Sequence, residues 1–132
     1  MLEPDSKRVL AEQQLMDQPP YCLDRSRQEA VLSSLQEVCS HRGWSLLAAR
    51  VRTNHVHVVV EAEVRPEKVM NDLKSYASRR LNRMGLDESN RKRWARHGST
   101  RWLWKREHVA AAIGYVLDQQ GDPMTVFKAL GA

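Results

Sequence analysis

Long apolar runs and paired cysteines are both missing from this chain of 132 residues. No stretch approaches the roughly 20 apolar residues that a membrane-spanning helix needs, so we expect no membrane partner. The first residues, MLEPDSKRVL, lack the apolar core of a signal peptide. Cys22 and Cys39 have no CxxC spacing, which indicates neither a disulfide framework nor a cysteine zinc site. We therefore expect a reduced, cytoplasmic protein.

Internal repeats and low-complexity tracts are absent as well. Hydrophobic residues make up 42% of the chain and charged residues 28%, the proportions of an ordinary globular protein. The length allows one hydrophobic core and is too short for two. We therefore expect a single domain over residues 1–132.

Two histidines stand two positions apart in an otherwise apolar run, TNHVHVVVEA. Successive residues of a strand alternate between the faces of the sheet, so His55 and His57 share one face. Two neutral imidazoles would then lie side by side on a rigid strand, which predicts a metal site; purely structural histidines are the alternative. The opposite face is core, because it carries only Val56, Val58 and Val60.

Proline, glycine and capping residues divide the chain into expected elements. Asp24 is a good N-cap, Gly43 a helix stop, and Pro66 suits the first turn of a later helix. Thr53 and Asn54 join two apolar segments, as in a β-hairpin. The segment LDESNRKRWARHGST has no periodicity and is expected to be a loop. The expected elements are helices over 5–17, 24–42, 66–83 and 107–120, and strands over 44–52, 55–62 and 100–105.

The three tyrosines occupy different kinds of position. Tyr76 falls on the apolar stripe of its helix, which predicts core packing, and Tyr21 lies in a turn beside prolines. Tyr115 lies away from the apolar stripe of the 107–120 helix, and Gln119, four residues later, projects beside it. Tyr115 is therefore the tyrosine available for chemistry.

A phenol, an amide oxygen and two imidazoles suit the cleavage of a phosphodiester. The mixed nitrogen and oxygen set favours Mn²⁺ or Mg²⁺ over structural zinc. Such a metal would bind and orient the scissile phosphate. A phenol, with a pKa near about 10, becomes a nucleophile when a base or a metal assists it. The covalent phosphotyrosine would store the bond energy for a later rejoining.

Positive charge is concentrated in one part of the chain. The net charge is +5, and most of the excess lies between Arg65 and Arg106, where arginines outnumber lysines and tryptophans are interleaved. A solvated surface is one interpretation, but this mixture favours contacts with phosphates and bases of a nucleic acid. The residues predicted to contact DNA are Arg79, Arg80, Arg83, Arg91, Lys92, Arg93, Arg96, Arg101, Trp102 and Lys105.

These motifs resemble those of the HUH endonuclease superfamily. HVH resembles the HUH motif, in which U is a large hydrophobe, and YVLDQ resembles the tyrosine helix of the single-tyrosine members. The segments RTNHVHVVVEA, VMNDLKSYASRRLN, RWARHGSTRWLW and YVLDQQGDPM together resemble insertion-sequence transposases with one tyrosine and their REP-associated relatives. The likeness spans about residues 24–127.

The resemblance implies both a fold and an activity. The fold would be α+β, a ferredoxin-like antiparallel sheet with helices packed on one side. The activity would be that of a metal-dependent single-stranded DNA endonuclease and strand transferase, a transposase acting at hairpin-marked ends. Tyr115 would be the nucleophile, with Gln119 the third ligand beside His55 and His57 for Mg²⁺ or Mn²⁺. The products would be a 5′-phosphotyrosine and a free 3′-OH.

One departure from the family bears on assembly. Relatives begin with a strand central to the sheet, whereas residues 5–17 here read as a helix, so we expect that strand to be missing. Two strands alone make a marginal sheet, and open edges recruit other chains. Relatives of this type often work as dimers. We therefore expect a homodimer, joined through a sheet edge or by exchange of the 107–120 helix.

Two rival functions fit parts of the pattern. A histidine-triad nucleotide hydrolase would need HxHxH, but the third position here is Val59. A catalytically inactive transposase relative that only binds DNA hairpins is the main alternative to the enzyme.

Overall fold

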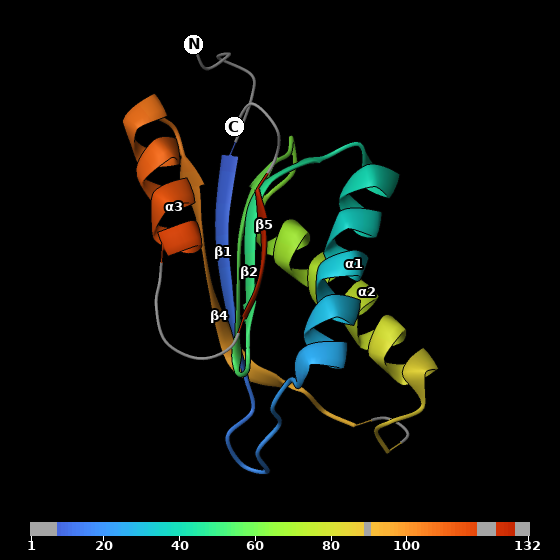
Figure 1. Cartoon of the computed structure of the whole chain (residues 1–132). Coiled ribbons are helices and arrows are strands. Elements are labelled where there is room, and N and C mark those ends of the chain that lie inside the picture. Colours follow the sequence, from blue (N-terminus) through green and yellow to red (C-terminus); the bar gives the residue numbers. More distant parts are fainter. Residues whose placement is uncertain (1–7, 89–90, 119–123, 129–132) are drawn as a thin grey trace.

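An antiparallel sheet forms the middle layer of the protein (Figure 1). The computed structural model describes residues 8–88, 91–118 and 124–128. Across the sheet in this part of the chain, the strands stand in the order β4-β1-β3-β2-β5. The histidine motif therefore lies on the central strand. The strands are β1 (Arg8–Leu15), β2 (Ser45–Arg52), β3 (His55–Glu61), β4 (Trp94–Leu103) and β5 (Met124–Lys128).

Helices cover both faces of the sheet. Helices α1 (Arg25–Arg42) and α2 (Pro66–Met84) pack together on one face, and α3 (Arg106–Asp118) lies on the opposite face (Figure 1). The predicted fold class, an α+β fold with an antiparallel sheet packed against helices, is confirmed. Placing all helices on one side was wrong. The second face also carries buried apolar residues, among them Ala48, Val59 and Leu103, and α3 covers them.

The strand expected to be missing is present. Residues 8–15 form β1, which pairs with β3 on one side and β4 on the other. Buried and partly exposed residues alternate along the whole strand, the period-two pattern of a sheet. Our expectation of a helix over 5–17 was wrong, because the consecutive polar residues Glu12, Gln13 and Gln14 mask the alternation. The sheet is thus completed within one chain.

Both edge strands depart from expectation too. β4 begins at Trp94, inside the segment expected to be a loop, and its end overlaps the strand expected over 100–105; β5 was not foreseen. Among the described strands β4 pairs with β1 alone, and its many polar residues leave no apolar alternation in the sequence. β5 pairs with β2 at the other edge.

The predicted capping residues lie at the ends of the helices. Asp24 accepts a hydrogen bond from the backbone N–H of Arg27 at 2.9 Å, Gly43 ends α1 with a φ of 75°, and Pro66 begins α2. β2 and β3 form the predicted hairpin. None of the described helices is long and apolar enough to cross a membrane.

The central strand separates two apolar clusters. Val56, Val58 and Val60 belong to the main core under α1 and α2, as predicted. Val59 belongs to the smaller cluster under α3, with Val109 and Val116 of that helix. The face of β3 that carries the two histidines is therefore the face that α3 covers.

Candidate active site

The two histidines lie on successive positions of the β3 face that α3 covers. Their ring centroids are 5.7 Å apart, with an angle of 31° between the planes. His57 is buried, with 4% of its surface exposed, while His55 is partly exposed and its Nδ1 lies 2.9 Å from Oδ1 of Asn54. Burial, and then the charges of His57 and Arg52, lower the pKa of His55. Neutral imidazole, the form that ligates metals, is therefore favoured at neutral pH.

Tyr115 is the tyrosine that lies beside the histidines. Its ring centroid is 6.1 Å from that of His57, and 48% of its surface is exposed. On α3, Val109, Ala112 and Val116 face the core, so the predicted off-core position of Tyr115 is confirmed. The arrangement brings a phenol next to an imidazole at the mouth of a hollow.

The other two tyrosines are occupied elsewhere. Tyr76 packs against the main core on the α1–α2 side, as predicted, and its hydroxyl lies 2.9 Å from Nδ1 of His41. Tyr21 is buried and donates a hydrogen bond to Asp87. Neither contacts the histidine pair.

The ring nitrogens of His57 indicate that the histidine pair suits a metal ion. Neither of its ring nitrogens has a hydrogen-bond partner in the part of the chain that the structure describes, although both are buried. A buried polar atom without a partner is costly, and a bound cation would satisfy the free lone pair. Among the described residues no three His, Cys, Asp or Glu side chains gather into a metal-binding group. The predicted third ligand, Gln119, lies outside the described residues.

A hollow of about 420 Å³, lined by both apolar and polar side chains, opens between α3 and the β1–β4 edge of the sheet. Glu12 of β1 and Arg101 of β4 line it together with Tyr115, and Ser99 and Thr100 contribute hydroxyls. The hollow thus combines a cation, a carboxylate and the phenol beside the histidine pair.

Two residues of this site were missed by the sequence analysis. Glu12 lies directly across from His57 in the β1–β3 pairing, with its Oε1 3.5 Å from Nδ1 of His57. The His57 imidazole lowers the pKa of Glu12, against burial, which raises it. The alternation of β1 could have placed Glu12 on this face, had the segment been read as a strand.

Arg50 is the second missed residue. It lies directly across from His57 on the β2 side, is 1% exposed, and donates a hydrogen bond to the Leu117 carbonyl near the end of α3. Arg50 therefore ties the tyrosine helix to the strand beside the histidines.

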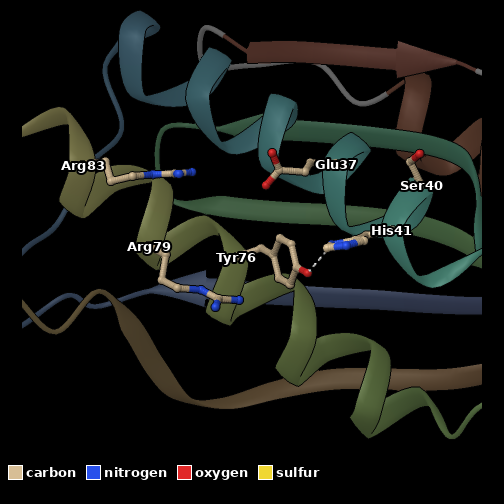
Figure 2. A pocket seen from close by; sticks show the side chains of 6 residues that line it. All are labelled: Glu37, Ser40, His41, Tyr76, Arg79 and Arg83. Carbon is tan, nitrogen blue, oxygen red and sulfur yellow. Dashed lines mark hydrogen bonds between the residues drawn. The ribbon is translucent and has the colours of Figure 1, made fainter.

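The residues predicted to contact DNA do not form one surface. Arg101 lines the hollow beside Tyr115, whereas Arg79 and Arg83 line a second hollow of about 650 Å³ between α1 and α2. Figure 2 shows their guanidinium groups at this second hollow, near the Tyr76–His41 pair. The two hollows lie on opposite sides of the sheet.

Arg80, Arg91 and Arg93, among the predicted DNA contacts, donate hydrogen bonds within the protein. Arg80 bonds to Ser33 at 2.8 Å and Glu37 at 3.0 Å, and Arg91 donates to the Pro20 carbonyl at 2.7 Å. Arg93 is only 2% exposed and bonds to Asp87 at 2.9 Å. Including Arg93 among the DNA contacts was wrong, because a buried guanidinium held by a carboxylate cannot reach a phosphate.

The remaining predicted contacts lie at the surface. Lys92, Arg96 and Lys105 are exposed. Trp102 is partly buried against the main core, and its ring centroid is 5.7 Å from that of Trp104, which is 61% exposed. These residues flank or belong to β4, the edge strand nearest the hollow beside Tyr115.

Two transposases are among the solved structures that resemble this fold. One is a REP-associated tyrosine transposase bound to a REP hairpin, with a TM-score of 0.63 and 12% identity over 88% of this chain and 67% of that chain. The other, from Deinococcus radiodurans R1, is assigned as a transposase and has a TM-score of 0.61 and 17% identity over 84% of this chain and 88% of that chain. A search of curated proteins returns no match.

The family model described as "Transposase IS200 like" matches residues 20–120. This segment includes the histidine pair, the hairpin that presents it and the tyrosine helix up to its described end. The chain therefore belongs to the IS200-like transposase family, a family of DNA-processing enzymes.

Proposed function

We propose that this protein is a metal-dependent enzyme that cuts and rejoins single-stranded DNA, with Tyr115 as the nucleophile. The observation that carries the proposal is the position of the Tyr115 ring, 6.1 Å from the ring of His57 and at a hollow that Arg101 also lines. His55, His57 and Gln119 would hold Mg²⁺ or Mn²⁺. When bound, the metal supplies positive charge that stabilises the phosphate and favours the phenolate.

In the proposed reaction, Tyr115 forms and later releases the covalent bond to DNA. The Tyr115 hydroxyl oxygen attacks the phosphorus and its proton passes to solvent. The bond between phosphorus and the 3′-oxygen breaks, and that oxygen takes up a proton from water. A 5′-phosphotyrosine and a free 3′-OH result. Attack by a 3′-OH on the phosphotyrosine reverses the step and joins two strands.

Hairpin-bearing single-stranded DNA is the proposed substrate. The net charge of +5 and the exposed basic side chains around β4 suit a polyanion. The REP-associated transposase that shares this fold was solved with a REP hairpin. Arg101 is the predicted DNA contact that lines the same hollow as Tyr115.

We also propose a homodimer, but the reason is now the open sheet edges and not a missing strand. β1 completes the sheet within one chain, so a partner is not needed to supply a strand. The edge strands β4 and β5 remain the sheet edges at which a second copy could pair.

The first test is the formation of a covalent adduct. A panel of labelled single-stranded DNA hairpins is incubated with the protein and Mn²⁺, and SDS-stable protein–DNA adducts are counted on gels. Tyr115→Phe should abolish the adduct while unfolding free energy and DNA affinity stay within about 0.5 kcal/mol of wild type, since the side chain is half-exposed. Tyr76→Phe is the matched control and should form adduct normally. Adduct from Tyr115→Phe but not from Tyr76→Phe would refute the assignment.

A further inference from the structure

Glu12 and His57 face each other across the two most central strands of the sheet. The β1–β3 register puts their Cα atoms directly opposite, and Oε1 of Glu12 is 3.5 Å from Nδ1 of His57. Side chains at directly opposite positions of antiparallel strands are held in contact by the backbone itself. The His57 side chain is 6% exposed and that of Glu12 31%, so the contact lies at the border between core and hollow.

We propose that Glu12 is a positioning residue: its Oε1 approaches Nδ1 of His57 to 3.5 Å without a hydrogen bond in the structure, and a small shift lets it accept one from Nδ1–H, which leaves Nε2 as the lone pair for the metal. This inference rests on the proposed role of His57 as a metal ligand. Glu12 stands outside the histidine pair, the tyrosine and the amide on which that proposal depends.

The chemistry of imidazole requires such a partner. A neutral imidazole has one N–H and one lone pair, and the hydrogen bond made by one nitrogen decides which nitrogen is left to bind a metal. Metal-binding histidines commonly donate their second nitrogen to a carboxylate, which fixes the tautomer and the ring orientation. Within the described residues, Glu12 is the one carboxylate recorded within 4.0 Å of a His57 ring nitrogen.

The geometry also distinguishes positioning from direct ligation. The lone-pair directions of Nδ1 and Nε2 diverge, because the nitrogens lie on different sides of the ring. A carboxylate that faces Nδ1 therefore faces away from a cation at Nε2. Glu12 also lines the hollow with Arg101, whose charge offsets that of a carboxylate near an anionic substrate.

Two substitutions at Glu12 separate the possible roles. Glu12→Gln keeps the shape and an oxygen that can accept from Nδ1–H, whereas Glu12→Ala removes the acceptor. Glu61→Gln is the control, because Glu61 lies at the end of β3 on the same face, where it pairs with Arg8. Thermal unfolding of each variant establishes that the fold is retained, and the near-isosteric Glu12→Gln keeps the test open if Glu12→Ala does not fold.

The first measurement is Mn²⁺ affinity by titration calorimetry, with the metal alone as the probe. A lost outer hydrogen bond to a ligating histidine weakens metal affinity about 10- to 100-fold, which is the result expected for Glu12→Ala. Glu12→Gln should lose less than about tenfold, and Glu61→Gln should match wild type. Unchanged affinity in Glu12→Ala would overturn the proposal. Equal large losses in both Glu12 variants would make Glu12 a direct ligand instead.

The second measurement is the tautomer of His57 in metal-free protein, read from its ring ¹⁵N shifts by NMR. Wild type and Glu12→Gln should hold the Nδ1–H form, and Glu12→Ala should populate both tautomers. An Nε2–H form in wild type would overturn the proposal. Because this readout needs no metal, it decides the role of Glu12 even if the protein binds no Mn²⁺, an outcome that would count against the proposed function alone.

Discussion

At the scale of single residues, the buried ion pair of Arg93 and Asp87 is held by an extended set of hydrogen bonds. Asp87 accepts hydrogen bonds from Arg93 at 2.9 Å and Arg27 at 3.0 Å, and from the Tyr21 hydroxyl. Arg93 also donates to Asn82 at 2.9 Å. These contacts tie together the turn before α1, α1 itself and the segment between α2 and β4. The guanidinium of Arg93 thus has its hydrogen-bond partners inside the fold, which explains why Arg93 is not at the surface.

Removing Asp87 should therefore destabilise the protein strongly. Asp87→Ala leaves a guanidinium that is 1% exposed without its anion, and breaking such a pair costs about 3–5 kcal/mol. Urea unfolding at pH 7 measures the loss. The exposed pair of Arg25 and Glu29 gives the control, since Glu29→Gln should change the unfolding free energy by at most about 1 kcal/mol.

The same carboxylate makes stability depend on pH. Burial raises the pKa of Asp87, but the hydrogen bonds from Tyr21, Arg93 and Arg27 outweigh it and hold the pKa below its ordinary value. The carboxylate then stabilises the fold above the unfolded pKa, near about 3.9, and this stability is lost as pH falls through the lower folded pKa. Asp87→Asn should lack this acid-sensitive part, and parallel pH profiles for the two proteins would contradict the assignment.

At the scale of elements, β1 and β4 approach each other closely at Gly98. A methyl group there would lie 2.3 Å from Oε1 of Gln13 and 3.1 Å from the carbonyl oxygen of Glu12. The Gln13 amide would have to move, although it donates to the Ala95 carbonyl at 2.9 Å. Gly98→Ala should therefore cost about 1–3 kcal/mol of unfolding free energy, measured in urea. Ser99→Ala, at the next and exposed position, should be near neutral; an equal loss in both would refute the close approach.

The hollow between α1 and α2 is expected to bind DNA phosphates through Arg79 and Arg83 (Figure 2). Arg79→Gln and Arg83→Gln together remove both cations. This double variant should reduce the slope of log affinity against log salt by about 1.4 for single-stranded DNA, or about 0.7 for each phosphate. Filter binding from 50 to about 300 mM salt measures it. The control removes two ion-paired cations of α1 instead, with Arg25→Gln and Arg42→Gln together. The prediction fails if the two double variants give the same slope.

Elements that carry their own boundary residues could be predicted from the sequence. α1, the β2–β3 hairpin and α2 have local caps, turns and apolar stripes, and alternation alone placed His55 and His57 on one face. β1 and the first part of β4 could not be found, because their polar stretches acquire strand character only from pairing with distant strands; the strand expected over 100–105 overlaps only the end of β4. Glu12 and Arg50 were missed for the same reason, since their proximity to His57 is a matter of sheet register.

At the scale of the whole molecule, the open question is whether the tyrosine serves the histidines of its own chain. In the described chain, Tyr115 lies beside His57 of the same subunit. If two copies exchange their tyrosine helices, subunits with His57→Ala and subunits with Tyr115→Phe should restore cleavage when mixed, because one composite site in the mixed dimer is intact. Adduct formation after co-refolding, with light scattering for the mass, measures both. Full activity of a strict monomer at micromolar concentration would contradict the homodimer.

The central place of β1 also sets the order in which the chain can fold. Arg8 pairs with Glu61 on one side and with Leu103 on the other, so the first strand acquires its second neighbour only after most of the sequence is available. Contacts between such distant residues slow folding, because long loops must close before the contacts form. During synthesis, β1 therefore has an unpaired edge until β4 has emerged, and the histidine face is complete only after α3 has followed.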